Sequence, residues 1–245
     1  MLNRLDLRGV ADLASHLPRP TVDGDEPVAA VRSILAEVRE RGDDALLEYT
    51  ASFDGVTLES LAVPASELQA ALESISPEER RALELARDRI AAHHEAQMSA
   101  PVEHDDGGIH ITSYRRPVDR VGCYVPGGRA SYPSTLLMTA VPALVAGVPE
   151  VVVCVPPDRS TGRIAPITLA AAAVAGVHEV RPVGGAQAIA ALAYGTESSA
   201  TTTTSLGPAN AAAIPTVPAT SCLASATYLL PGPQITSTGR IDSVP

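Results

Sequence analysis

The sequence predicts an α/β protein in which a helical N-terminal segment precedes a parallel sheet built as βαβαβ. Three observations carry this prediction. Short apolar strands alternate with helical stretches after residue 108. Two of these strands run into glycine pairs, Gly127-Gly128 and Gly184-Gly185. The core must be aliphatic, because the 245 residues include one Phe, six Tyr and no Trp. Such a core is typical of a sheet that helices cover on both faces.

In the N-terminal third, the spacing of apolar residues predicts helices. Apolar side chains recur at steps of three and four residues over 25–42, and Gly42 suits the end of this helix. A second short helix should begin at Asp44. Ser76 and Glu79 have the spacing of a capping box, which opens a long, polar-faced helix to about Met98.

After residue 108 the chain is predicted to become a Rossmann-like α/β unit. Strands that alternate with helices are expected to pair in parallel through right-handed crossovers. In such sheets, ligands bind beyond the carboxyl ends of the strands, and both glycine pairs lie at those ends. The predicted strands span 109–114, 118–125, 150–155 and 178–183, and the predicted helices span 133–146, 165–175 and 186–194.

The composition changes abruptly after Glu197. Over 198–239 no residue is charged, and Ser, Thr, Ala and Pro make up about two thirds of the stretch, which predicts mostly irregular chain. We therefore divide the sequence into a helical N-terminal segment (1–108), a Rossmann-like half (109–197) and a low-complexity tail (198–245). A shift of reading frame produces a change this abrupt, so the tail is interpreted as out of frame or otherwise replaced.

Charge and cysteine content argue against several classes of function. Lys and Arg number 18 against 28 Asp and Glu, and the net charge of −10 repels nucleic acid and anionic membranes. The first 20 residues carry charges in place of an apolar signal sequence. The three cysteines have neither paired nor zinc-type spacing, so no disulfide framework is expected. These features predict a cytoplasmic protein without a nucleic-acid or membrane partner.

The glycine pairs have two interpretations. Glycine lets a ligand approach the backbone closely, and a helix that begins nearby offers free N–H groups to an anion. A plain strand-to-helix turn uses the same residues, and neither pair forms the G-x-G-x-x-G pattern of dinucleotide-binding proteins.

Other reactive residue types have structural interpretations. His93, His94 and Glu95 lie together late in the long predicted helix, but no further residue has the spacing of a metal ligand. Cys123 stands near the end of a predicted strand without an identifiable base, which is typical of a small buried hydrophobe rather than a nucleophile. The residues alone therefore identify no catalytic nucleophile and no metal site.

Six segments resemble the histidinol dehydrogenase family in their order and spacing. The most specific are Tyr-Val-Pro-Gly-Gly at 124–128 and Gly-Gly-Ala-Gln-Ala-Ile-Ala at 184–190. The resemblance covers approximately residues 3–197. The six segments are 38–46, 48–50 with 53–55, 94–97, 122–128, 133–138 and 183–196.

This resemblance implies an NAD-dependent, zinc-containing dehydrogenase that oxidises L-histidinol to L-histidine in two steps. It also implies an aldehyde-dehydrogenase-like two-domain architecture and a homodimer. Tyr124 and Gln187 match family positions that contact NAD. Asn210 is the third expected NAD contact, because residues 207–210 read Gly-Pro-Ala-Asn where the family has Gly-Pro-Gly-Asn.

The resemblance places the zinc ligands, and a Glu–His pair for proton transfer, beyond the point where this sequence diverges from the family. We therefore assign no catalytic and no metal-binding residue in this chain. The expectation is a chain that is truncated relative to the family, with an incomplete second domain, and inactive by itself. The alternative is a noncatalytic fragment that binds a nucleotide or another subunit.

Overall fold

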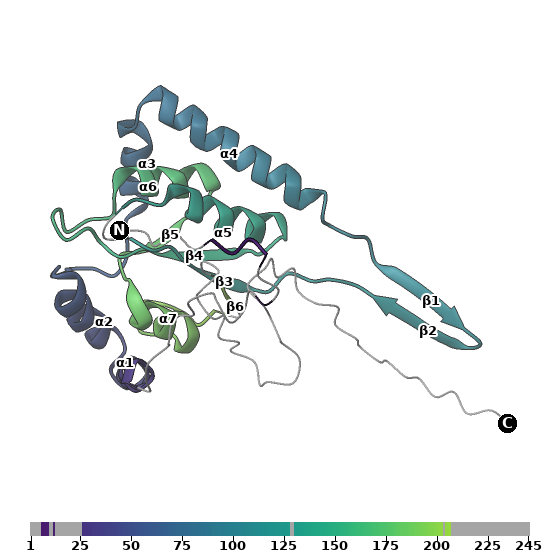
Figure 1. Cartoon of the computed structure of the whole chain (residues 1–245), viewed down its shortest axis with the longest axis horizontal. Coiled ribbons are helices and arrows are strands. Elements are labelled where there is room, and N and C mark those ends of the chain that lie inside the picture. Colours follow the sequence, from purple (N-terminus) through teal and green to yellow (C-terminus); the bar gives the residue numbers. More distant parts are fainter. Residues whose placement is uncertain (1–5, 10–11, 13–25, 128–129, 203, 207–245) are drawn as a thin grey trace.

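The computed structural model describes residues 6–9, 12, 26–127, 130–202 and 204–206 (Figure 1). No helix in these ranges has the length and apolar character needed to cross a membrane. The helices are α1 (Glu26–Arg41), α2 (Asp43–Tyr49), the π-helix η1 (Thr50–Asp54), α3 (Ala65–Ser74), α4 (Pro77–Glu95), α5 (Pro133–Val145), α6 (Pro166–Ala175) and α7 (Gly185–Tyr194). The strands are β1 (Val102–Asp106), β2 (Ile109–Ser113), β3 (Arg120–Tyr124), β4 (Glu150–Cys154), β5 (Glu179–Arg181) and β6 (Thr204–Leu206).

Four of the strands form a parallel sheet in the order β5-β4-β3-β6. Val121 of β3 lies opposite Val151 of β4 on one side and opposite Thr204 of β6 on the other. The chain runs outward from β3 through α5 to β4 and through α6 to β5, and it returns through α7 to β6. The predicted α/β architecture with a parallel sheet is confirmed, and the direction of strand addition reverses at β3.

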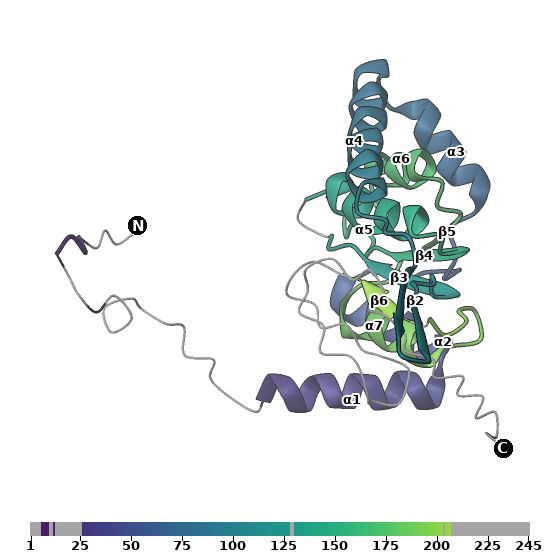
Figure 2. The ribbon, with the colours of Figure 1, turned by 90° about the vertical axis from the view of Figure 1, so that its right-hand side faces the viewer.

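Helices cover both faces of this sheet (Figures 1 and 2). Helices α5 and α6 lie on one face, with α3 and α4 packed against them, while α7 lies on the other face with α1 and α2. Along β4, Val151 and Val153 belong to the first core, and Val152 and Cys154 belong to the second. Burial on both faces explains why this strand is an unbroken apolar run in the sequence.

The helices of the N-terminal third agree with the sequence patterns that predict them. Helix α4 begins with the predicted capping box, in which the Glu79 N–H donates to Ser76 Oγ (3.1 Å) and the Ser76 N–H donates to the Glu79 carboxylate (2.8 Å). Helix α3 has no counterpart among the predicted elements. Leu68 and Ala71 are its buried residues, too few to give a clear periodic signal.

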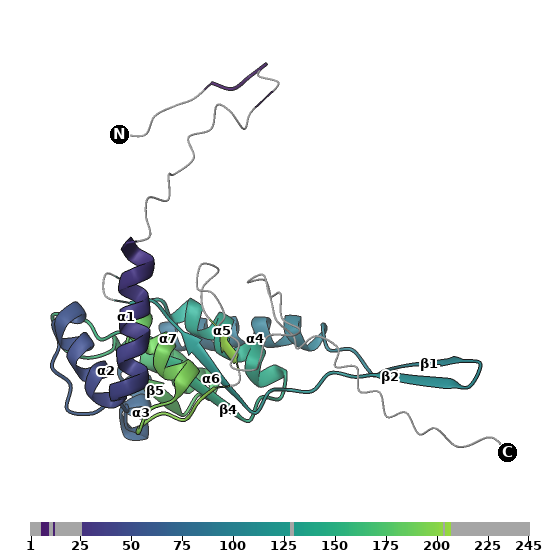
Figure 3. The ribbon, with the colours of Figure 1, turned by 90° about the horizontal axis from the view of Figure 1, so that it is seen from below.

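Residues 102–113 form an antiparallel hairpin that projects from the body of the molecule (Figures 1 and 3). The predicted strand at 109–114 therefore pairs with β1 and does not join the parallel sheet. Every residue of β1 is exposed, and all but Val102 are polar, so no hydrophobic pattern reveals this strand. The boundary expected at residue 108 falls in the hairpin turn.

The fold continues past Glu197, the boundary that the composition suggests. The Thr202 N–H donates to the Leu192 carbonyl (2.8 Å), and β6 pairs with β3. Arg181 also donates a hydrogen bond to the Ser198 carbonyl. The sequence does not reveal β6, because Thr-Ser-Leu contains no apolar run. The rest of the expected tail, over 207–245, lies outside the described residues.

Ion pairs join the amino ends of three neighbouring strands. Arg120 of β3 donates to the carboxylates of Glu150 in β4 (2.5 Å) and Glu179 in β5 (2.6 Å). Arg181 binds the same Glu179 carboxylate at 2.9 Å. Burial opposes ionisation of Glu179, but hydrogen bonds and charge from the two arginines outweigh it and hold the pKa of Glu179 below its usual value. The Arg120 side chain is 13% exposed and that of Glu179 is 30% exposed, so their pair is partly shielded from water, whereas Glu150 is 60% exposed.

Replacing Arg120 with Met should lower the free energy of unfolding at neutral pH by about 3 kcal/mol, because Glu179 keeps a partly buried charge with one cation fewer. The loss should shrink as the pH falls below 4.5, the ordinary Glu value, since a depressed pKa stabilises only while the carboxyl is ionised. Urea denaturation measures both effects. Arg80→Met, which breaks an exposed pair with Glu84, is the control and should cost less than about 1 kcal/mol. Equal losses in the two variants would contradict this account.

Candidate functional site

The carboxyl ends of three parallel strands meet around Pro156. This proline follows β4, while Gly127 follows β3 and Gly184 follows β5. A Cβ at Gly184 would lie 2.5 Å from the Cβ of Pro156, and one at Gly127 would lie 2.9 Å from its Cγ. Both positions therefore require glycine for space. The backbones of the three strand ends therefore pack closely around Pro156 and form a glycine-rich edge.

Tyr124, the last residue of β3, joins this edge to the first turn of α7. The Gly185 N–H donates a hydrogen bond to the Tyr124 hydroxyl oxygen at 3.2 Å. Gly185 has φ +62°, a conformation that favours glycine. Burial raises the pKa of Tyr124, and the negative charge of Asp54 raises it further, although the Gly185 N–H acts in the opposite direction. The hydroxyl is therefore neutral at physiological pH.

Gln187 lies in the first turn of α7 and is 1% exposed. Neither Oε1 nor Nε2 of its amide has a hydrogen-bond partner in the part of the chain that the structure describes. The amide lies beside Gly185, where a Cβ would come within 2.4 Å of Oε1. A buried amide without partners costs about 1–3 kcal/mol, which a ligand that bonds to it would recover.

The π-helix η1 brings Asp54 close enough to Tyr124 for its charge to raise the pKa of that hydroxyl. Arg159, in the loop after β4, donates to the carbonyls of Phe53 (2.8 Å) and Asp54 (3.1 Å). Burial raises the pKa of Asp54, while Arg159 opposes the shift. The segment Phe53-Asp54-Gly55 is visible in the sequence as a family resemblance, but only the fold shows that it lies near Tyr124.

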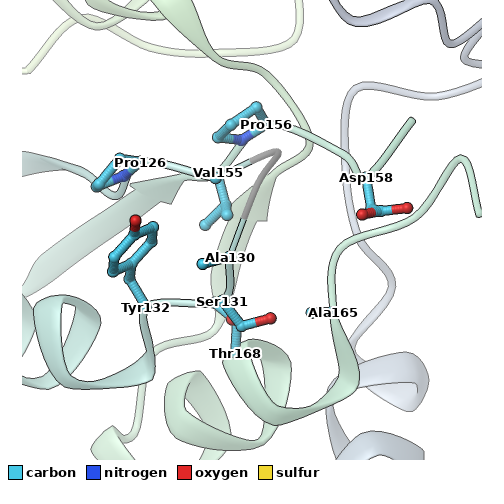
Figure 4. Close-up of a pocket in the computed structure, with 10 residues that line it drawn as sticks. Pro126, Ala130, Ser131, Tyr132, Val155, Pro156, Asp158, Ala165 and Thr168 are labelled. Carbon is cyan, nitrogen blue, oxygen red and sulfur yellow. The ribbon is translucent and has the colours of Figure 1, made fainter. Parts of the chain in front are cut away.

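A pocket of about 160 Å³ opens between the loop after β3 and the N-terminus of α6 (Figure 4). Pro126, Gly127 and Pro156 line it and also belong to the glycine-rich edge. Its polar wall includes Asp158 and Thr168, neither of which the sequence analysis singled out. Both residues come from connections between elements that a sequence pattern marks only as turns or helix starts.

The structure brings together two of the three residues expected to contact NAD. Tyr124 and Gln187 lie on either side of Gly185, as described above. Asn210 lies outside the described residues. The roles of all three remain predictions from the resemblance.

The alternative reactive groups have the surroundings of structural residues. Cys123 is fully buried, and burial raises the pKa of its thiol to about 12, so it carries no thiolate at neutral pH. His94 Nδ1 lies 2.8 Å from the side-chain oxygen of Gln97, whose nitrogen lies 3.2 Å from Nε2 of His93. Within the described ranges, no three His, Cys, Asp or Glu side chains gather as metal ligands would.

Comparison with known proteins decides the family. A family model described as histidinol dehydrogenase matches residues 17–214. The chain belongs to the histidinol dehydrogenase family. The match includes Asn210, so the family likeness reaches beyond residue 197, where the sequence patterns alone ended it.

Relatives within the histidinol dehydrogenase family support this assignment over most of the chain. The chain is 46% identical to the histidinol dehydrogenase of Rhizobium meliloti, over 86% of this chain and 49% of that protein. It is 41% identical to that of Methanothermobacter thermautotrophicus, over 85% of this chain and 48% of that protein. The crystal structure of histidinol dehydrogenase from Elizabethkingia anophelis matches with a TM-score of 0.74 and 32% identity, over 78% of this chain and 44% of that one. The chain thus spans about half the length of the relatives it matches.

Replacing Gln187 with Met should raise the free energy of unfolding of the ligand-free chain by about 1–2 kcal/mol. Methionine fills a similar volume and removes two buried polar atoms that have no partner in the described structure. Urea denaturation measures the change. The control is Gln69→Met at an exposed position of α3, where the amide bonds to Glu73 and little change is expected. A clear loss of stability in the Gln187 variant would mean that its amide is already satisfied.

Proposed function

We propose that the described part of this chain is the cofactor-binding half of a histidinol dehydrogenase, an oxidoreductase of histidine biosynthesis. The observation that carries the proposal is the buried amide of Gln187, which has no partner among the described residues and lies beside the Tyr124–Gly185 hydrogen bond. A buried amide that has no partner among the described residues can form hydrogen bonds to a bound ligand. Membership in the family indicates which ligand and which reaction.

The proposed cofactor is NAD, bound to a Rossmann-like sheet. Strand addition reverses at β3, and in open parallel sheets ligands bind beyond the carboxyl ends of the strands near such a reversal. Gly127 and Gly184 let Pro156 pack against their backbones, which holds the three strand ends together beside the first turn of α7. Helix α7 begins at the same edge, and the positive end of its dipole favours the negatively charged pyrophosphate of a dinucleotide.

The side chains of this edge supply complementary hydrogen bonds. The Tyr124 oxygen accepts from the Gly185 N–H, so its own proton remains to be donated to the cofactor. The Gln187 amide provides one acceptor and one donor. Asn210 is the third proposed contact. NAD, when bound, accepts a hydride from the substrate in each of the two oxidations that convert L-histidinol to L-histidine.

The zinc ion and the proton-transferring Glu–His pair that the family implies are assigned to no described residue. L-Histidinol as substrate, a homodimer as the working form and the cytoplasm as its location are proposed from the resemblance to the family. Because only the cofactor side is assigned, we expect the 245-residue chain to bind NAD but not to oxidise L-histidinol by itself.

The proposal is tested by titrating the 245-residue chain with NAD in a calorimeter. Tyr124→Phe and Gln187→Met should each weaken NAD binding by about three- to tenfold, the usual range for one lost hydrogen bond. Tyr194→Phe, at the far end of α7, is the matched control and should leave the affinity unchanged. Failure of the unmodified chain to bind NAD, or equal affinities in all variants, would refute the proposed site.

A further inference from the structure

The pocket beside the glycine-rich edge has the size of one sugar ring rather than of a whole dinucleotide. Its volume is about 160 Å³, below the range of about 300–1,000 Å³ for drug-sized ligands. It lies between the ends of β3 and β4 and shares Pro126, Gly127 and Pro156 with the proposed NAD site. A group bound there would therefore lie next to the glycine-rich edge, on the α6 side of Pro156.

Thr168 contributes a hydroxyl-bearing side chain to the floor of this pocket. Thr168 is 2% exposed, lines the pocket and makes no side-chain hydrogen bond to a described residue (Figure 4). It lies in the first turn of α6, whose N-cap, Ala165, has no side chain able to cap the helix. A hydroxyl both donates and accepts, so it suits a hydroxyl group of a ligand.

Asp158 holds a rigid carboxylate on the side of the pocket opposite Tyr132 (Figure 4). Its Oδ1 accepts hydrogen bonds from the backbone N–H groups of Ser160 (2.8 Å) and Thr161 (3.1 Å), and from the Ser160 hydroxyl. These bonds keep the pKa of Asp158 below its usual value, so the group is ionised at neutral pH. They all use Oδ1, which leaves Oδ2 for a ligand.

The position of Asp158 in the chain indicates which ligand group its carboxylate could bind. In dinucleotide-binding parallel sheets, an acidic side chain after the second strand of the βαβ unit accepts a hydrogen bond from the ribose 2′-hydroxyl. Here β4 is the second strand of the β3–α5–β4 unit and ends at Cys154, just before the loop that holds Asp158. We propose that Asp158 and Thr168 bind the adenosine ribose of the cofactor, and that Asp158 makes the site select NAD over NADP.

Selectivity follows from charge. NADP carries a phosphate on the 2′-oxygen, and this dianion would lie against the ionised carboxylate of Asp158. The neighbouring guanidinium of Arg159 is committed to the carbonyls of Phe53 and Asp54. This assignment rests on the proposed function, since it requires that the glycine-rich edge bind a dinucleotide.

The test uses calorimetric titration of the 245-residue chain with NAD and, separately, with NADP. The unmodified chain should bind NAD at least tenfold more tightly than NADP. Asp158→Asn keeps the oxygen that Ser160 and Thr161 require and removes the charge, so the variant should fold normally. It should weaken NAD binding about three- to tenfold and reduce the preference for NAD at least fivefold.

Thr168→Val and Asp119→Asn complete the set. Thr168→Val has nearly the same shape without the hydroxyl and should weaken NAD and NADP by similar factors, leaving the preference unchanged. Asp119→Asn removes one exposed charge just before β3, at the amino ends of the strands, and should change neither the NAD nor the NADP affinity. An unmodified chain that binds NAD without preferring it, or an Asp158→Asn variant that keeps the full preference, would overturn this inference and leave the NAD site standing. A chain that binds neither nucleotide would overturn the proposed function itself.

Discussion

The packing of Pro156 between Gly127 and Gly184 is the constraint on which the site depends. The ends of three parallel strands can approach this closely because neither glycine carries a Cβ. The same approach brings the first turn of α7 within hydrogen-bonding distance of Tyr124. It also leaves room for a pocket on the α6 side of the proline. The packing of Pro156 therefore places the glycine-rich edge, the first turn of α7 and the pocket next to one another.

The outer layer of helices is fastened to this framework by polar contacts at its ends. Arg159 donates to two carbonyls of η1, which ties the loop after β4 to the π-helix. Glu197 accepts a hydrogen bond from the Asp43 N–H (2.9 Å), which ties the chain after α7 to the first turn of α2. The apolar contacts between this layer and α7 include Val38 and Leu46 on one side and Leu192 on the other. The π-helix belongs to a class of irregularities that is frequent at functional sites.

Elements with a strong local signal could be predicted from the sequence, whereas contacts between distant segments could not. Ser76 and Glu79 predict the start of helix α4, and an apolar run predicts β4. Both patterns are local, because capping and burial on two faces each constrain the residue types within a few positions. Strand β6 and the hairpin strand β1 leave no such mark, since one is three residues long and the other is polar and exposed. Tyr124 and Gln187 could be named from their resemblance to the family. The pocket that joins Asp158 to Thr168 forms only when the connections after β3 and β4 fold against each other.

The late position of β6 in the chain has a consequence for synthesis on the ribosome. Strand β3 lies inside the finished sheet, between β4 and β6, yet its second neighbour is translated about eighty residues after it. At 5–20 residues per second, that delay is about 4–16 seconds. Throughout it, the edge of β3 that β6 will cover presents unpaired backbone groups, which can pair with the edge of another chain. Until residue 206 has left the ribosome, this edge of the growing polypeptide is therefore open to pairing with other chains.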